Sequence, residues 1–269
     1  MMNIHQLKRT GAVALPSLFT IGNMAFGFFS ILAALDKDFP RAGWFIFGAM
    51  VMDVLDGRIA RLVHGESKFG VEMDSLADFL SFGVAPAFVM HQFQLKDYGF
   101  WGYPVAFIYT LCGGLRLARF NVMSHDGLNS KQHFTGLSIP IGAGILASFV
   151  ISYSLLETSG SVHSMKFLMN QMPFVYNLIP FIMLGLSFLM VSGIPYAAFK
   201  QGNIFRPRTI RGLIFGIALI FIIVYYRQDA IFLFLSLYVI SGLIAGLWRA
   251  FRNIAAGGKK EEISETLQP

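Results

Sequence analysis

The sequence predicts an all-α integral membrane protein with about eight transmembrane helices and with both termini in the cytoplasm. Hydrophobic residues make up 55% of the 269-residue chain and charged residues only 13%, whereas a soluble domain carries about 25% charged residues. The mean hydropathy of +0.60 also favours a membrane protein over a soluble core. Apolar runs of about 20 residues, long enough to cross a bilayer as a helix, recur along most of the chain.

Eight of these runs are the expected membrane spans. In chain order they are Leu15–Leu35, Ala42–Leu62, Met73–Phe93, Phe100–Phe120, Gly136–Leu156, Phe174–Ala198, Arg211–Tyr226 and Ala230–Trp248. The last two are short, so they either cross the bilayer or form a re-entrant pair. We expect a cytoplasmic or interfacial segment at residues 1–14, a single transmembrane domain at residues 15–249 and a disordered cytoplasmic tail at residues 250–269.

The distribution of Lys and Arg predicts the orientation, because cytoplasmic loops carry an excess of these residues. With a cytoplasmic N-terminus, the expected inside regions hold 16 of the 21 Lys and Arg residues and the outside loops hold five. This bias supports the number of spans and predicts a multi-pass protein of the cell's inner membrane.

The net charge of +6 does not predict binding to nucleic acid. The basic residues lie in short clusters between apolar runs, and the sequence has no stripe of basic and aromatic residues for stacking bases. We therefore expect no nucleic-acid partner. The lone Cys112 cannot form a disulfide within the chain and is interpreted as a packing residue.

Four aspartates interrupt this apolar chain at helical spacing. Asp53 and Asp56 lie three residues apart near the end of the second span, and Asp74 and Asp78 lie four residues apart near the start of the third. Residues three or four apart share one face of a helix. Consecutive spans are antiparallel, so both pairs are expected at the same depth, on the cytoplasmic side, where the four carboxylates converge.

Converging carboxylates repel one another, and hard divalent cations such as Mg²⁺ or Mn²⁺ remove that repulsion. Four carboxylates suffice for two such ions, a recurrent arrangement in phosphoryl chemistry. The residues between the pairs fit a phosphate ligand: Gly57 and Gly70 allow close approach to the backbone, Arg61 offers a bidentate contact and Ser67 a hydroxyl. The alternative to a metal site is that the acidic residues mark a solvated loop end and that Asp74 caps a helix. This would explain one aspartate, but not four at paired helical spacing.

In the stretch from Asp53 to Asp78 the chain resembles the CDP-alcohol phosphotransferases. These are membrane enzymes that displace CMP from a CDP-linked lipid or alcohol with a second alcohol. The residues that match every fixed position of the family signature are Asp53, Asp56, Gly57, Ala60, Arg61, Gly70, Asp74 and Asp78. The resemblance implies that Asp53, Asp56 and Asp74 are ligands of two divalent cations, Mg²⁺ or Mn²⁺. It implies that Asp78 is both a ligand and the general base.

The resemblance also implies a site for the CDP-linked lipid. Residues that match this region are Asp53, Gly57, Ala60, Arg61, Ser67 and Gly70. Further segments are similar to the phosphatidylserine synthase branch of the family: Pro16–Phe28, Met73–Ala87, Gly114–Asn121 and Phe134–Pro140. This branch implies CDP-diacylglycerol and L-serine as substrates, membrane lipids as surroundings and an active site at the cytoplasmic face.

Three polar residues at the cytoplasmic end of the fourth span are candidates for binding serine. Arg116 and Arg119 share a helix face on the aspartate side of the membrane, and a bidentate contact from Arg would recognise the serine carboxylate. Asn121 is a further polar candidate. Anchoring of the helix end at the membrane surface explains the two arginines equally well.

Several alternatives stay open from the sequence. The acceptor is glycerol phosphate, inositol phosphate or choline in sister transferases, and an archaeal-type ether lipid is another possible donor. A divalent-cation transporter is the alternative outside enzymes, although its acidic residues belong near the middle of the membrane. Small residues four apart, Gly212 with Gly216 and Gly242 with Gly246, allow close helix packing, either within the chain or in the homodimer that we expect.

Overall fold

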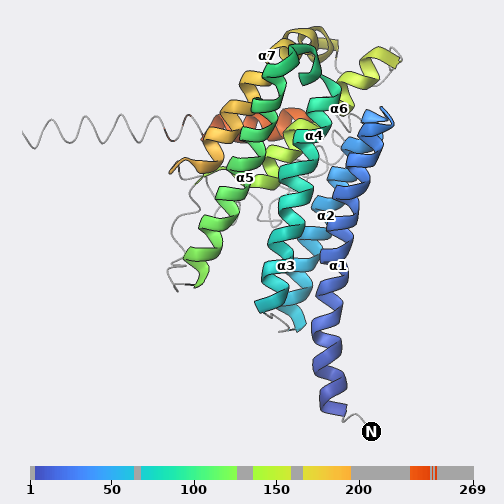
Figure 1. Cartoon of the computed structure of the whole chain (residues 1–269), viewed down its shortest axis with the longest axis vertical. Coiled ribbons are helices and arrows are strands. Elements are labelled where there is room, and N and C mark those ends of the chain that lie inside the picture. The colour runs from blue at the N-terminus through green and yellow to red at the C-terminus, as the bar shows by residue number, and fades with distance from the viewer. Residues whose placement is uncertain are drawn as a thin grey trace, which may run out of the picture.

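The computed structural model describes residues 4–63, 68–125, 136–158, 166–194 and 231–242, together with residues 244 and 246. Every regular element in these ranges is helical, which confirms the all-α part of the predicted fold class (Figure 1). The elements are α1 (Ile4–Leu35), α2 (Phe39–Val63), α3 (Lys68–Asp78), the π-helix η1 (Phe79–Val84), α4 (Ala85–Phe93), the 3₁₀-helix η2 (Leu95–Trp101), α5 (Gly102–His125), α6 (Ile139–Thr158) and α7 (Lys166–Val191). Residues 231–242 form a further helix.

The first six expected spans all fall on these helices, and the third corresponds to the continuous path of α3, η1 and α4. Within the described ranges, three helical stretches are long and apolar enough to cross a membrane by themselves: Leu18–Leu35, Phe69–Phe93 and Phe174–Val191. Shorter apolar helices run over Ile139–Ser154 and Ile231–Gly242. The expected span Arg211–Tyr226 lies outside the described residues. The helix of the first span begins earlier than expected, at Ile4, so it includes most of the segment at residues 1–14.

Neighbouring helices pack along much of their length. The most extensive packing is between α1 and α2, followed by α2 with α6 and α5 with α7. The turn between α1 and α2 and the short η2 lie at one end of the bundle, whereas the start of α3 and the end of α5 lie at the other (Figure 1). The continuous path of α3, η1 and α4 therefore starts at the end of the bundle where α2 ends (Figure 1).

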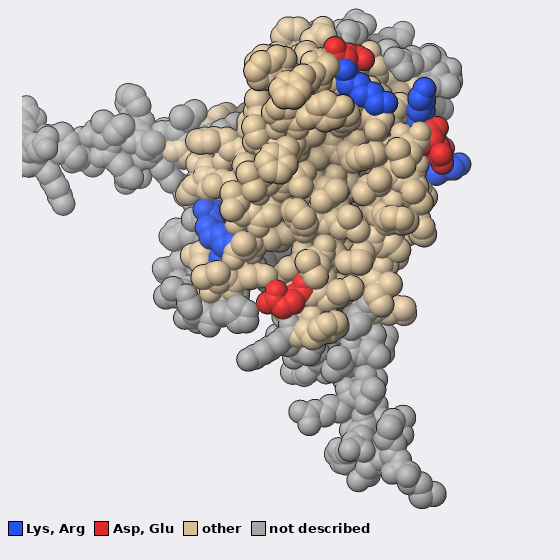
Figure 2. Space-filling model, viewed as in Figure 1, with Lys and Arg blue, Asp and Glu red and all other residues tan. Residues whose placement is uncertain are grey.

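Large apolar side chains cover the outside of the bundle. On α7, Phe181 and Phe188 are each 70% exposed, and on α5 Phe107 is 65% exposed. A soluble monomer rarely exposes so much contiguous apolar surface, whereas lipid chains solvate it. Figure 2 shows charged side chains near the upper end and in the lower half of the face in view, with tan surface between them. The described part of the chain is therefore that of a helical membrane protein.

Close helix contacts depend on small residues. A Cβ added at Gly27 of α1 would lie 2.3 Å from Ser81 Oγ and 2.8 Å from Ser81 Cα in η1. One Gly of the predicted small-residue pairs, Gly246, packs within the chain, because an added Cβ would lie 2.8 Å from Ile194 Cγ2. Gly212 and Gly216 lie outside the described residues.

Replacing Gly27 with Ala is expected to lower the free energy of unfolding by about 1–3 kcal/mol, because the methyl group overlaps backbone as well as side-chain atoms of Ser81. Thermal unfolding in detergent measures the change. Gly185→Ala on α7 is the matched control, since an added Cβ there meets nothing within 4 Å. Equal stability of the two variants would contradict the close contact between α1 and η1.

Candidate metal centre

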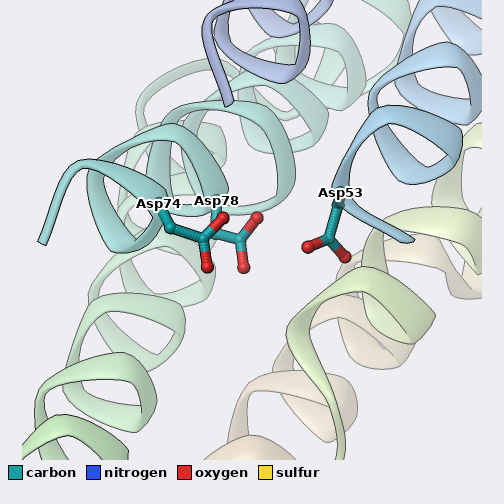
Figure 3. Close-up of side chains that lie close together, drawn as sticks. All are labelled: Asp53, Asp74 and Asp78. Carbon is teal, nitrogen blue, oxygen red and sulfur yellow. The ribbon is translucent and has the colours of Figure 1, made fainter. Parts of the chain in front are cut away.

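Three of the four aspartates converge between α2 and α3. Asp53 projects from α2 towards Asp74 and Asp78 of α3 (Figure 3). One carboxylate oxygen from each of the three lies within 4.8 Å of the others, and the three residues are half-buried. The helical spacing of the sequence thus places Asp74 and Asp78 together, and Asp53 of α2 faces them from the other side of the site.

The fourth aspartate, Asp56, lies beside this group but has a different partner. Its side chain is buried, and its carboxylate accepts a hydrogen bond from the Thr20 hydroxyl of α1. Its charge still acts on Asp53 and Asp74 across the site. The structure therefore describes a group of three carboxylates with a fourth one turn further along α2.

The three-carboxylate group fits a divalent cation by its chemistry. Among the side chains that the structure describes, no Lys or Arg forms an ion pair with Asp53, Asp74 or Asp78. Half-buried carboxylates in this arrangement repel one another unless a proton or a cation lies between them. Carboxylate oxygens are the ligands that Mg²⁺ and Mn²⁺ prefer, and two oxygens on opposite sides of one Mg²⁺ lie about 4 Å apart. Oxygens that all lie within 4.8 Å of one another are compatible with that separation.

The backbone changes its helix type directly after the last of these aspartates. The π-helix η1 begins at Phe79 and buries Ser81, Phe82 and Gly83. Short π-helical turns are frequent at functional sites, since the extra residue per turn rotates the flanking side chains. The sequence carries no signal for this turn.

Two residues of α1 that sequence reasoning missed contact the aspartates. Thr20 hydrogen-bonds Asp56, and the Asn23 amide nitrogen donates to Asp78 Oδ1 at 2.9 Å. Both side chains are buried. Their only signal in the sequence was the presence of two polar residues, three apart, inside an apolar run.

The residues predicted to bind the CDP-linked lipid lie around the connection between α2 and α3. Gly57 is exposed, and an added Cβ there would meet no atom within 4 Å, so the space beside the end of α2 is open. Gly70 lies near the start of α3 and is half-buried. Ala60 and Arg61 belong to α2, but their side chains and all of Ser67 lie outside the described residues.

The three residues predicted to bind serine have different surroundings. Arg119 Nη1 donates to the Val191 carbonyl at the end of α7 at 2.9 Å, and Asn121 Nδ2 donates to Ser75 Oγ of α3 at 2.9 Å. Arg116 Nε is buried and has no hydrogen-bond partner among the described residues. It belongs to α5, which packs against η1, the segment directly after Asp78. Arg116 is therefore the one of the three with a buried donor that has no partner among the described residues.

Comparison with known proteins identifies the family. The profile of the CDP-alcohol phosphatidyltransferases matches residues 13–176, which include all four aspartates and Arg116. The chain belongs to this family. A relative from Helicobacter pylori named CDP-diacylglycerol–serine O-phosphatidyltransferase is 35% identical over 236 residues, which are 87% of this chain and 91% of the relative.

Other members of the CDP-alcohol phosphatidyltransferase family extend the likeness. A protein of the same name from Bacillus subtilis is 32% identical over 70% of this chain and 92% of its own length. The archaetidylserine synthase of Methanothermobacter thermautotrophicus is 36% identical over 70% of this chain and 72% of its own length. Enzymes of this family use divalent metals, and the carboxylates of Asp53, Asp74 and Asp78 are the group that would bind them here.

Proposed function

We propose that the chain transfers the phosphatidyl group of CDP-diacylglycerol to the hydroxyl of L-serine, which yields phosphatidylserine and CMP. The observation that carries this proposal is the likeness to the Helicobacter pylori CDP-diacylglycerol–serine O-phosphatidyltransferase over 87% of the chain. The converging carboxylates of α2 and α3 supply the kind of site that this reaction requires.

The proposed chemistry begins at Asp78, which accepts the proton of the serine hydroxyl. The serine oxygen then forms a bond to the phosphorus that carries diacylglycerol, and the bond from that phosphorus to the oxygen of CMP breaks. Two divalent cations, Mg²⁺ or Mn²⁺, held by Asp53, Asp56, Asp74 and Asp78, would neutralise the charge on the diphosphate and on departing CMP. Asn23 holds one Asp78 oxygen, which leaves the other oxygen for the proton transfer.

The CDP-linked lipid is proposed to bind at the connection between α2 and α3. Its proposed contacts are Asp53, Gly57, Ala60, Arg61, Ser67 and Gly70. Open space beside Gly57 supports this position. The lipid chains would stay in the bilayer against the apolar outer surface of the helices.

We propose that Arg116 binds the serine carboxylate. Its Nε is buried and unpaired among the described residues, and its helix α5 packs against η1, which directly follows Asp78, the proposed base. A carboxylate held by Arg116 would place the serine hydroxyl, two carbon atoms away, on the Asp78 side. Arg119 and Asn121 line the same end of α5, and their direct contact with serine stays a prediction.

The proposed arrangement in the membrane has eight spans, both termini in the cytoplasm and the carboxylates at the cytoplasmic face of the inner membrane. The excess of Lys and Arg in the expected inside regions supports it. The single transmembrane catalytic domain at residues 15–249, the flanking segments at residues 1–14 and 250–269, and a homodimer also stay predictions.

The decisive assay uses the purified full-length protein in vesicles that contain CDP-diacylglycerol. With labelled serine and Mg²⁺ or Mn²⁺ we expect labelled phosphatidylserine and an equal amount of CMP, because each transfer releases one CMP. EDTA should abolish both products, and added Mg²⁺ or Mn²⁺ should restore them, because the site consists of carboxylates that need a cation. Lipid chromatography and nucleotide chromatography measure the two products.

Other acceptors and donors are the controls of that assay. Transfer to glycerol phosphate, inositol phosphate or choline without transfer to serine would indicate a sister transferase. Metal flux without release of CMP would indicate a transporter. A CDP-linked archaeal-type ether lipid should be compared as the donor, since one relative is named archaetidylserine synthase. Sealed vesicles of both orientations test the membrane arrangement: serine added outside should react only in inside-out vesicles.

A further inference from the structure

The first helix carries a small polar face directed at the aspartates. Thr20 and Asn23 are three residues apart on α1, so they share one side of the helix, and they are only 3% and 0% exposed. Their neighbours in the chain are apolar, and the sequence has no charged residue between Arg9 and Asp36. Two buried polar groups in such a helix need partners.

Each of the two residues has an aspartate as its partner, and the two aspartates belong to different helices. The Thr20 hydroxyl donates to the Asp56 carboxylate of α2. The Asn23 amide nitrogen donates to Asp78 Oδ1 of α3 at 2.9 Å. A carboxylate only accepts hydrogen bonds, so Asn23 has to turn its nitrogen to Asp78. Its Oδ1 then remains buried without a partner among the described residues.

The position of Asn23 is fixed from the other side as well. Ser81 Oγ of η1 donates to the Asn23 backbone carbonyl at 2.8 Å. One turn further along α1, Gly27 lets the backbone of η1 approach so closely that an added Cβ would lie 2.8 Å from Ser81 Cα. These two contacts hold α1 against the segment that directly follows Asp78, which limits the movement of Asn23 relative to that carboxylate.

Neutral donors suit a site that binds cations. A Lys or Arg at either position would neutralise the carboxylates and compete with a metal ion, whereas a hydroxyl and an amide orient them and leave their charge in place. Hydrogen bonds to metal-binding carboxylates fix the direction in which their free oxygens point. Thr20 and Asn23 each donate to one carboxylate oxygen, of Asp56 and Asp78 respectively, and the second oxygen of each carboxylate is left for a cation.

We propose that Thr20 and Asn23 are positioning residues of the metal centre, which hold the carboxylates of Asp56 and Asp78 from α1 in the orientation that binds divalent cations. This inference rests on the proposed function and adds a third helix to the site. Each of the two residues acts by orienting an aspartate, and neither contacts the substrate.

The test is a titration of the purified full-length protein with Mn²⁺, without substrate, followed by electron paramagnetic resonance of free Mn²⁺. Thr20→Val and Asn23→Leu keep the branched shape of each side chain and remove the donor. We expect both to weaken Mn²⁺ binding about 10- to 100-fold. Thr20→Ser keeps the hydroxyl and should bind Mn²⁺ like the unsubstituted protein.

Ser30→Ala is the matched control. Ser30 is also fully buried on α1, but its hydroxyl donates to the Ala42 carbonyl at 2.8 Å, away from the aspartates. The Ser30→Ala variant should bind Mn²⁺ like the unsubstituted protein. Its thermal unfolding measures the effect of losing one buried hydrogen bond. If Asn23→Leu fails to fold, the Thr20→Val and Thr20→Ser pair decides the result.

The outcomes separate the inference from the function on which it rests. Mn²⁺ affinity within about twofold of the unsubstituted protein in Thr20→Val and Asn23→Leu would overturn the positioning role. The same loss in Ser30→Ala would also overturn it, because the effect would then follow stability alone. An unsubstituted protein that binds no Mn²⁺ would instead refute the metal centre of the proposed function.

Discussion

Asp78→Asn is expected to lower kcat about 10²- to 10⁴-fold, the usual contribution of a positioned general base. An amide has nearly the shape of the carboxylate, and its oxygen still accepts the hydrogen bond from the Asn23 nitrogen. The packing of α3 and η1 against α1 should therefore persist. What disappears is the group that takes the proton from the serine hydroxyl. Release of CMP at saturating serine and Mg²⁺ measures the change.

Asp53→Asn is the control that separates a base from a metal ligand. Asp53 belongs to the same three-carboxylate group but lies on α2. Loss of a ligand alone weakens metal binding, so a high concentration of Mn²⁺ should recover much of the activity of Asp53→Asn. Asp78→Asn should stay inactive at every Mn²⁺ concentration. Substantial turnover in Asp78→Asn would rule out Asp78 as the base.

Arg116→Gln is expected to raise the KM for serine about 10- to 100-fold. A hydrogen bond to a charged group contributes about 1.5–3 kcal/mol, and each 1.4 kcal/mol is a factor of ten in binding. The KM for CDP-diacylglycerol should change little, since the predicted contacts of the CDP moiety lie at the connection between α2 and α3. Initial rates at varied serine and at varied lipid separate the two constants.

Arg119→Gln removes the same charge three residues further along α5 and is the comparison for Arg116→Gln. Its guanidinium donates to the Val191 carbonyl, and Gly136 lies so close that an added Cβ would be 3.1 Å from Arg119 Nη2. We therefore expect Arg119→Gln to lower the thermal stability more than it raises the KM for serine. An equal rise in both variants would assign serine binding to both arginines, and a rise in the lipid KM alone would contradict the role given to Arg116.

The comparison of Arg116 with Arg119 shows where sequence reasoning reached its limit. Helical spacing placed both side chains on one face of α5, which is a local property of the chain. Which of them meets the end of α7 depends on how α5 packs on α7, and no spacing along one helix contains that information. The same holds for Asn121, whose amide meets Ser75 of α3.

The sequence by itself determined the helical membrane fold, the places of the helices that coincide with the first six expected spans, the two pairs of aspartates and, through the spacing of the signature, the family. These features follow from hydropathy and from the 3.6-residue period of a helix, which operate within single segments.

Only the tertiary structure decided that Asp56 turns to Thr20, which leaves three of the four carboxylates grouped, and that Asn23 holds Asp78. In lipid both the inner and the outer faces of a helix are apolar, so hydropathy does not reveal which face meets which neighbour. That choice depends on close packing at small residues such as Gly27 and on hydrogen bonds between distant segments, and both exist only once the helices are assembled.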